Sequence, residues 1–193
     1  LIRDSLANHH PFIIENGAAV YIPQDYFEKQ PEGTEKRGKY WVKSFVQPRS
    51  YWQSLINQLR PKYQNDFVTF ADAGIDGIIA MTGLNVHAAA CAARREFGEP
   101  VSWHGNGNLK QQFIAELNAL GANILEGGRF LHVSGQCDKG RALKWLTDMY
   151  QNTMPEQVIQ TLAIGDSQND KAMLEQADHA LVIRSPVHGL PDI

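Results

Sequence analysis

The stretch "TLAIGDSQNDKAML", residues 161–174, is the feature that most constrains the fold. Its first four residues are typical of a buried strand, and a helical spacing of apolar residues resumes at Lys171. Asp166, Asn169 and Asp170 lie between the two. A strand that leads directly into a helix predicts an α/β unit. In open α/β sheets ligands bind at the carboxyl ends of the strands, which is where these polar side chains fall.

The same alternation of strand and helix patterns runs along most of the chain. Residues 16–17, Asn-Gly, predict a turn between two short strands. One helix face is predicted by four apolar residues at positions i, i+3, i+4 and i+7, which are Trp52, Leu55, Ile56 and Leu59. Alternating strands and helices predict an α/β fold, and we expect a Rossmann-like core built on a parallel sheet.

Two changes of pattern, near Ser44 and near Gly135, indicate a division of the chain. We expect residues 1–43 and 136–193 to form the core, incomplete in this sequence, and residues 44–135 to form an inserted α+β module.

Composition excludes several classes of function. The chain has 193 residues and a net charge of −3, so we expect no broad contact with nucleic acid. No apolar run approaches the roughly 20 residues that a membrane-spanning helix needs, so we expect no membrane partner. Cys91 and Cys137 are far apart and lack metal-site or redox spacing, which favours a reducing, cytoplasmic location. The sequence leaves the oligomeric state open.

The acidic residues after the strand suit a divalent cation. Asp166 follows the strand end, and Asn169 and Asp170 lie at the start of the next helix, where negative charge is favoured. Carboxylate and amide oxygens are suitable ligands for Mg²⁺. The alternative is that Asp and Asn simply cap the helix.

A second candidate lies in "SGQCDKGRALKWL". Asp138 is a good helix N-cap, and Lys139 falls in the first helical turn, where its charge opposes the helix dipole. A bound phosphate would offset that cost, because free backbone N–H groups and lysine both attract anions. The alternative is an exposed, solvated lysine.

Together these stretches resemble the haloacid dehalogenase superfamily of phosphotransferases. GDSQND looks like the fourth motif of that superfamily, and Lys139 in DKG looks like its third-motif lysine. "PFIIENGA" resembles the segment after the second motif in the branch with a large cap, known as IIB. Within that branch, "ARREFGEPVSW" and "GGRFLHV" are similar to the mannosyl-3-phosphoglycerate phosphatase group.

The resemblance implies roles for the residues that match the motifs. Asp166 would ligate Mg²⁺ directly, while Asn169 and Asp170 would support the metal, directly or through water. Lys139 would neutralise the phosphoryl group and its nucleophile and would itself be held by Asn169 and Asp170; Lys139 and Asp170 are the catalytic candidates.

The resemblance also implies a small phosphorylated sugar as substrate, recognised by the inserted module. The residues expected to contact its sugar and glycerate ends are Arg95, Glu96, Glu99, Arg129 and His132. Arginine suits a glycerate carboxylate because its planar fork binds bidentately. For Arg95 the alternative is a solvated charge at a helix end.

One departure from the superfamily pattern matters. The sequence has no DxDGT stretch, which carries the nucleophilic aspartate, and no counterpart of the second-motif Ser or Thr. Asp72 in "FADAGIDG" has the wrong spacing to replace it. We therefore expect both motifs to lie upstream of Leu1, and the 193-residue chain alone to be inactive.

The expected activity of the complete protein is Mg²⁺-dependent hydrolysis of mannosyl-3-phosphoglycerate through an aspartyl-phosphate intermediate. Two alternatives stay open. The substrate is another sugar phosphate, such as glucosyl-3-phosphoglycerate or sucrose phosphate, or the chain is a ligand-binding remnant of the fold without catalysis.

Overall fold

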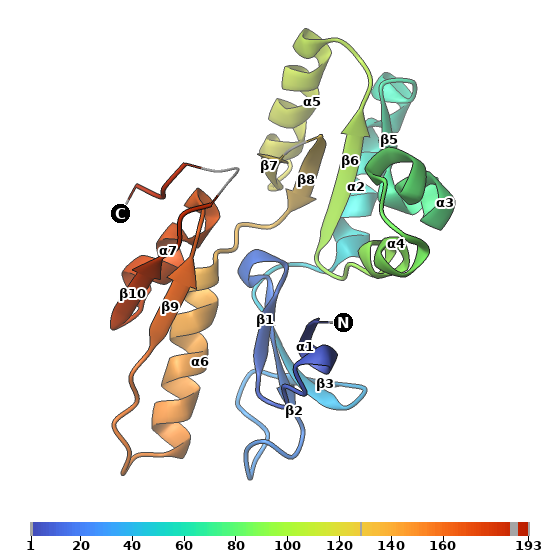
Figure 1. Cartoon of the computed structure of the whole chain (residues 1–193). Helices are drawn as coiled ribbons and strands as arrows, with labels where there is room; N and C mark the ends of the chain where they lie inside the picture. Colours follow the sequence, from blue (N-terminus) through green and yellow to red (C-terminus); the bar gives the residue numbers. More distant parts are fainter. Residues whose placement is uncertain (1, 128, 186–188, 193) are drawn as a thin grey trace. The chain divides into compact units, whose positions relative to one another are not determined.

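The structure is a computed structural model with two compact units (Figure 1). Unit 1 combines Leu1–Phe45 with Cys137–Ile193, and unit 2 is the continuous segment Val46–Gln136. The residues that the structure describes are 2–127, 129–185 and 189–192. Among them, no helix is both long and apolar enough to cross a membrane. The assignment of the middle segment as a substrate-selecting cap remains a prediction.

Unit 1 contains two sheets, with strand orders β1-β2-β4-β3 and β10-β9. Its first part consists of α1 (Ile2–Ser5), β1 (Phe12–Ile14), the 3-10 turn η1 (Glu15–Gly17), β2 (Ala19–Pro23), β3 (Glu35–Arg37) and β4 (Tyr40–Ser44). Its second part consists of α6 (Lys139–Thr153), β9 (Leu162–Gly165), η2 (Gln168–Asp170), α7 (Lys171–Gln176) and β10 (His179–Val182).

The core of unit 1 lies between α6 and the four-stranded sheet. Val20 and Ile22 of β2 are fully buried and pack with Ala142 of α6. Trp145 and Leu146 are partly buried against the same cluster. Ala142, Trp145 and Leu146 have the spacing i, i+3 and i+4 of one helix face, and α6 packs against the sheet with that face.

The predicted parallel sheet is found only in part. β9 and β10 are parallel, with Leu162 opposite His179, but all pairs in the four-stranded sheet are antiparallel. Three of that sheet's strands follow one another through turns without an intervening helix, as antiparallel neighbours do. In the described residues, unit 1 is therefore a mixed α/β structure rather than a parallel Rossmann-like sheet.

Unit 2 is an antiparallel sheet of order β5-β6-β8-β7 with helices packed against it. Its elements are α2 (Arg49–Tyr63), β5 (Phe67–Thr69), α3 (Phe70–Thr82), α4 (Val86–Ala93), β6 (Gly98–Trp103), α5 (Gly107–Ala119), β7 (Asn123–Gly127) and β8 (Phe130–Ser134). This combination matches the predicted α+β character of the module.

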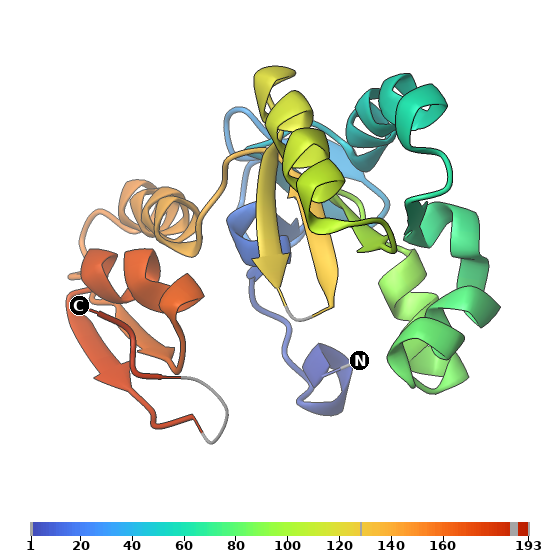
Figure 2. The ribbon, with the colours of Figure 1, turned by 90° about the horizontal axis from the view of Figure 1, so that it is seen from above.

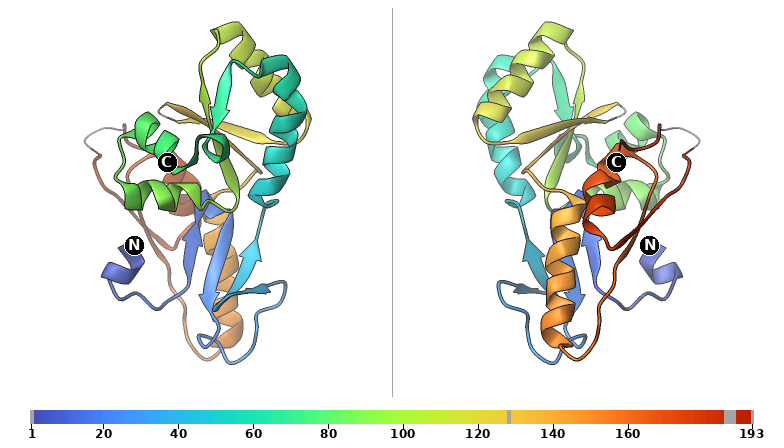
Figure 3. Two further views of the ribbon diagram at one scale, coloured as in Figure 1. Left: turned by 90° about the vertical axis from the view of Figure 1, so that its right-hand side faces the viewer. Right: turned by 90° about the vertical axis from the view of Figure 1, so that its left-hand side faces the viewer.

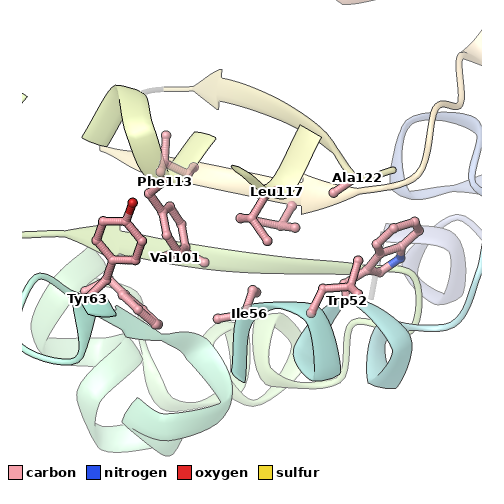
Figure 4. Close-up of a cluster of buried hydrophobic side chains, with 11 residues drawn as sticks. Trp52, Ile56, Tyr63, Val101, Phe113, Leu117 and Ala122 are labelled. Carbon is pink, nitrogen blue, oxygen red and sulfur yellow. The ribbon is translucent and has the colours of Figure 1, made fainter. Parts of the chain in front are cut away.

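The main core of unit 2 lies between α2, α5 and one face of the sheet. Figure 4 shows Tyr63 of α2 and Phe113 of α5 close to Val101 of β6, and all three are buried. Trp52 and Ile56 continue the cluster along the predicted face of α2. The predicted helix face is thus confirmed by its packing.

The helices α3 and α4 form a pair beside the sheet (Figure 3). Phe130 of β8 packs against a second cluster made of Phe70, Ile78 and Ala89. Its neighbour Leu131 belongs to the main core. Because successive side chains of a strand point to opposite faces of the sheet, α3 and α4 pack on the face opposite the main core.

Two local features differ from what the sequence favours. Asn108 is a plausible N-cap for α5 by its sequence pattern, but Asn106 takes that place, with its side chain accepting from the Leu109 amide. The polar pattern of residues 27–39 predicts an exposed loop or hairpin tip, and within it β3 forms because Lys36 pairs opposite Trp41 of the apolar strand β4. Pairing between strands is decided by the partner, so a polar edge strand has no periodic signal of its own.

Candidate active site

The GDSQND residues line an open cavity of about 440 Å³ in unit 1. It lies where β9 ends and η2 and α7 begin, beside the start of α6. Figure 2 shows the helices α6 and α7 side by side. Its polar lining consists of Lys139, Asp166, Ser167, Asn169 and Asp170. The structure therefore gathers all four of the predicted catalytic and metal residues around one space.

Lys139 and Asp170, which both line the cavity, form an ion pair. The Lys139 Nζ donates to Asp170 Oδ1 at 2.6 Å, and the Asp170 side chain is 8% exposed. Asp170 Oδ2 accepts from the main-chain N–H groups of Asp166, at 3.1 Å, and Ser167, at 3.2 Å. The Ser167 hydroxyl also lies 3.2 Å from this oxygen.

These donors decide the charge of Asp170. Burial by itself would raise the pKa of the carboxyl, but the hydrogen bonds from Lys139 and from the Asp166 N–H outweigh it. The pKa is therefore held below its usual value, and the Asp170 carboxyl group is ionised at neutral pH.

Two glycines allow the site to form. A Cβ on Gly140 would lie 2.2 Å from the carbonyl oxygen of Ala172, so only glycine lets the start of α6 approach α7 this closely. A Cβ on Gly165 would lie 2.5 Å from the Cβ of Asp170. The glycines of DKG and GDSQND thus bring Lys139 within reach of Asp170.

The residues of the cavity fit Mg²⁺, and the side-chain oxygens of Asp166 and Asn169 are the ligands available to it. Both side chains line the cavity, and Asn169 Oδ1 accepts a hydrogen bond from Ser167 Oγ at 2.6 Å. Asp170 is already engaged by four donors. No group of three or more His, Cys, Asp or Glu side chains suited to a metal occurs in the described part of the chain. Mg²⁺ commonly takes one or two carboxylates and completes its shell with waters and phosphate oxygens.

The predicted substrate residues all lie in unit 2, on different elements. Arg95 and Glu96 occupy the segment between α4 and β6, and Glu96 is exposed. Arg129 Nη2 donates to the carbonyl oxygen of Thr82, at 3.2 Å. His132 lies on β8, where burial and, second, the charge of Arg95 lower its pKa below the usual value.

Glu99 differs from the other four because its side chain has no exposed surface. Its carboxylate accepts from Arg49, Gln53 and the N–H of Ala71. Direct contact between Glu99 and a substrate stays a prediction. The sequence did not predict the pairing of Arg49 with Glu99, because the helix pattern of α2 depends on its apolar residues only.

Comparison with known proteins identifies the family of the chain and relates its fold to solved structures. Residues 107–187 match the haloacid dehalogenase-like hydrolases. A relative from Pyrococcus furiosus, named mannosyl-3-phosphoglycerate phosphatase, is 31% identical over 182 residues, which are 94% of this chain and 71% of the relative. The chain belongs to the haloacid dehalogenase-like hydrolases.

A second relative, from Methanococcoides burtonii, is named glucosyl-3-phosphoglycerate/mannosyl-3-phosphoglycerate phosphatase. It is 34% identical over 183 residues, which are 95% of this chain but 66% of the relative. The chain thus spans about two thirds of the length of the relatives that it matches.

Solved structures share the fold at low sequence identity. A crystal structure from Thermotoga maritima has a TM-score of 0.58 at 16% identity and covers 93% of this chain and 67% of its own. A subclass IIB sugar phosphatase of the haloacid dehalogenase superfamily has a TM-score of 0.53 at 11% identity, covering 94% of this chain and 66% of its own.

Proposed function

We propose that the complete protein is a Mg²⁺-dependent phosphatase for a phosphorylated sugar-glycerate of the mannosyl-3-phosphoglycerate type. The observation that carries the proposal is the Lys139–Asp170 ion pair on a cavity that Asp166 also lines. The names of the relatives from Pyrococcus furiosus and Methanococcoides burtonii support the substrate class.

Each polar residue of the cavity has a task in this reaction. Lys139 presents a positive charge to the phosphoryl group, and Asp170 holds that ammonium in place by a hydrogen bond. Asp166 and Asn169 would hold Mg²⁺, which when bound orients the phosphate and stabilises its charge. Ser167 fixes both neighbours by hydrogen bonds to Asn169 and Asp170.

The nucleophile of this reaction is an aspartate outside the 193 residues. It attacks phosphorus, the 3-hydroxyl of the glycerate leaves with its attached sugar, and the resulting aspartyl phosphate is hydrolysed by water to release inorganic phosphate. The residues described here therefore supply charge stabilisation and positioning, and not the covalent step.

We place substrate selection in unit 2. Arg95 and Arg129 would pair with the glycerate carboxylate, and His132 and Glu96 would bind sugar hydroxyls. A neutral imidazole serves as hydrogen-bond donor and acceptor, which agrees with the lowered pKa of His132.

The test is phosphate release by the protein expressed from its complete coding sequence. We expect hydrolysis of mannosyl-3-phosphoglycerate that requires Mg²⁺, and a loss of about 100-fold or more in kcat for Lys139→Met. Lys144→Met is the matched control, because Lys144 lies on the same helix in an exposed pair with Asp148. Metal-independent hydrolysis, or equal loss in both variants, would contradict the proposal.

A second candidate is the glucosyl analogue, favoured by the double name of the Methanococcoides burtonii relative. Comparing kcat/KM for the two sugar-glycerates and for sucrose phosphate separates these substrates. If the complete protein binds the sugar-glycerate but releases no phosphate, the chain is a ligand-binding remnant instead.

A further inference from the structure

A buried carboxylate lies at the edge of the unit 2 core. Glu99 is fully buried, and its two oxygens accept from Arg49 Nε at 2.5 Å, Arg49 Nη2 at 3.0 Å, Gln53 Nε2 at 2.7 Å and the Ala71 N–H at 3.1 Å. A carboxylate this well satisfied is held in one orientation, since every lost partner would leave a buried charge uncompensated.

The arginine of this pair also holds a neighbouring segment of backbone. Arg49 Nη1 donates to the carbonyl oxygen of Ala93 at 2.6 Å. The main-chain N–H of Arg49 donates to the carbonyl oxygen of Glu96 at 2.7 Å. Arg49 therefore holds the segment between α4 and β6 by hydrogen bonds on both sides of Arg95.

The fastened segment carries one of the residues assigned to the substrate. Arg95 lies between the two anchored carbonyl groups, and its positive charge adds to burial in lowering the pKa of His132 on β8. We propose that Arg49, fixed by Glu99, is the positioning residue that holds Arg95 where it receives the carboxylate-bearing end of the substrate. This inference rests on the proposed function and gives Glu99 an indirect role.

The geometry of the pair explains why the residue is an arginine. The planar guanidinium uses Nε and Nη2 for the carboxylate and still has Nη1 for the Ala93 carbonyl. A lysine keeps the positive charge but has a single nitrogen, which cannot reach both groups with this geometry. Arg49→Lys therefore loosens the segment while it leaves the net charge unchanged.

The first test is an NMR titration of His132, which needs no enzymatic activity. In Arg49→Lys we expect the His132 pKa to rise toward 6.5, in the same direction as in Arg95→Gln, because Arg95 moves away. Arg60→Lys is the control, since Arg60 lies on the same helix and pairs with the exposed Asp72. The His132 NMR signals of the folded protein are followed separately from those of unfolded protein, so that a loss of stability is not mistaken for a pKa change. If Arg49→Lys titrates like Arg60→Lys, the positioning role is overturned.

The second test compares substrates. We expect Arg49→Lys to raise KM for the sugar-glycerate by about tenfold or more and to leave hydrolysis of p-nitrophenyl phosphate unchanged. Equal losses on both substrates would overturn the proposal. Glu99→Asp keeps the charge but shortens the side chain, and it must likewise raise KM for the sugar-glycerate while it leaves p-nitrophenyl phosphate hydrolysis unchanged. An inactive parent protein would refute the proposed function alone, because the His132 titration still decides whether Arg49 positions Arg95.

Discussion

Substituting Gly140 by alanine is the sharpest test of how the candidate site is built. The new Cβ would lie 2.2 Å from the carbonyl oxygen of Ala172, so α6 and α7 must separate by about 1 Å to reach ordinary van der Waals distance. Both sides of this contact are backbone, and no side-chain rotation relieves it. Forcing such an overpacked contact costs about 1–3 kcal/mol.

Two further terms set the expected result. Alanine favours a helix over glycine by about 1 kcal/mol, which leaves a net loss of at most about 2 kcal/mol in the free energy of unfolding. The same 1 Å shift moves Lys139 away from Asp170, and a misplacement of that size costs about 100-fold in kcat. Activity should therefore fall much further than stability.

The assay combines urea unfolding of the complete protein with phosphate release under saturating substrate. Gly107→Ala is the control, because Gly107 also lies in the first turn of a long helix but a Cβ there meets no atom within 4 Å. We expect this control to retain activity and stability within about 0.5 kcal/mol. A Gly140→Ala protein that matches the control in both measurements would refute the reasoning.

Three other outcomes follow from the structure. Phe113→Ala should lower the free energy of unfolding by about 3–5 kcal/mol, because the ring is fully buried, whereas Val86→Ala at a 66% exposed site should have little effect in the same urea experiment. Because the pKa of Asp170 is lowered in the folded state, its ionised carboxylate should stabilise the fold above about pH 4. This contribution should be lost as the pH falls through the folded-state pKa, so the free energies of unfolding of wild type and Asp170→Asn should converge at low pH. His132 should titrate below 6.5 by NMR, and Arg95→Gln should raise that pKa, since burial and then the Arg95 charge lower it; an unchanged value would contradict their proximity.

Local signals in the sequence predicted much of the secondary structure. The apolar spacing of α2, the N-cap Asp138 and the Asn-Gly turn after β1 all appear in the structure as expected. Each depends on residues within one or two turns of the chain, which is the range that periodicity and capping describe. The candidate site was also predictable in outline, because GDSQND and DKG are short continuous motifs.

Features that depend on distant partners were not predictable in this way. The antiparallel pairing of the four-stranded sheet in unit 1 was missed, because strand direction depends on which strands meet and not on their own pattern. The burial of Glu99 was not predicted, because its partner Arg49 lies 50 positions earlier in the chain. A glutamate next to a proline contains no local sign that it will be enclosed.

The discontinuity of unit 1 has a consequence for biosynthesis. Ile22 needs Ala142 to complete its cluster, whereas unit 2 is one uninterrupted segment whose core partners all lie between Trp52 and Val133. At about 5–20 residues per second, the ribosome adds the 120 residues that separate Ile22 from Ala142 in roughly 6–24 s. The β1–β2 hairpin leaves the ribosome well before α6 and stays without this partner, while the inserted unit has time to fold. Chaperone demand in the cell should therefore centre on residues 1–45 rather than on the larger middle segment.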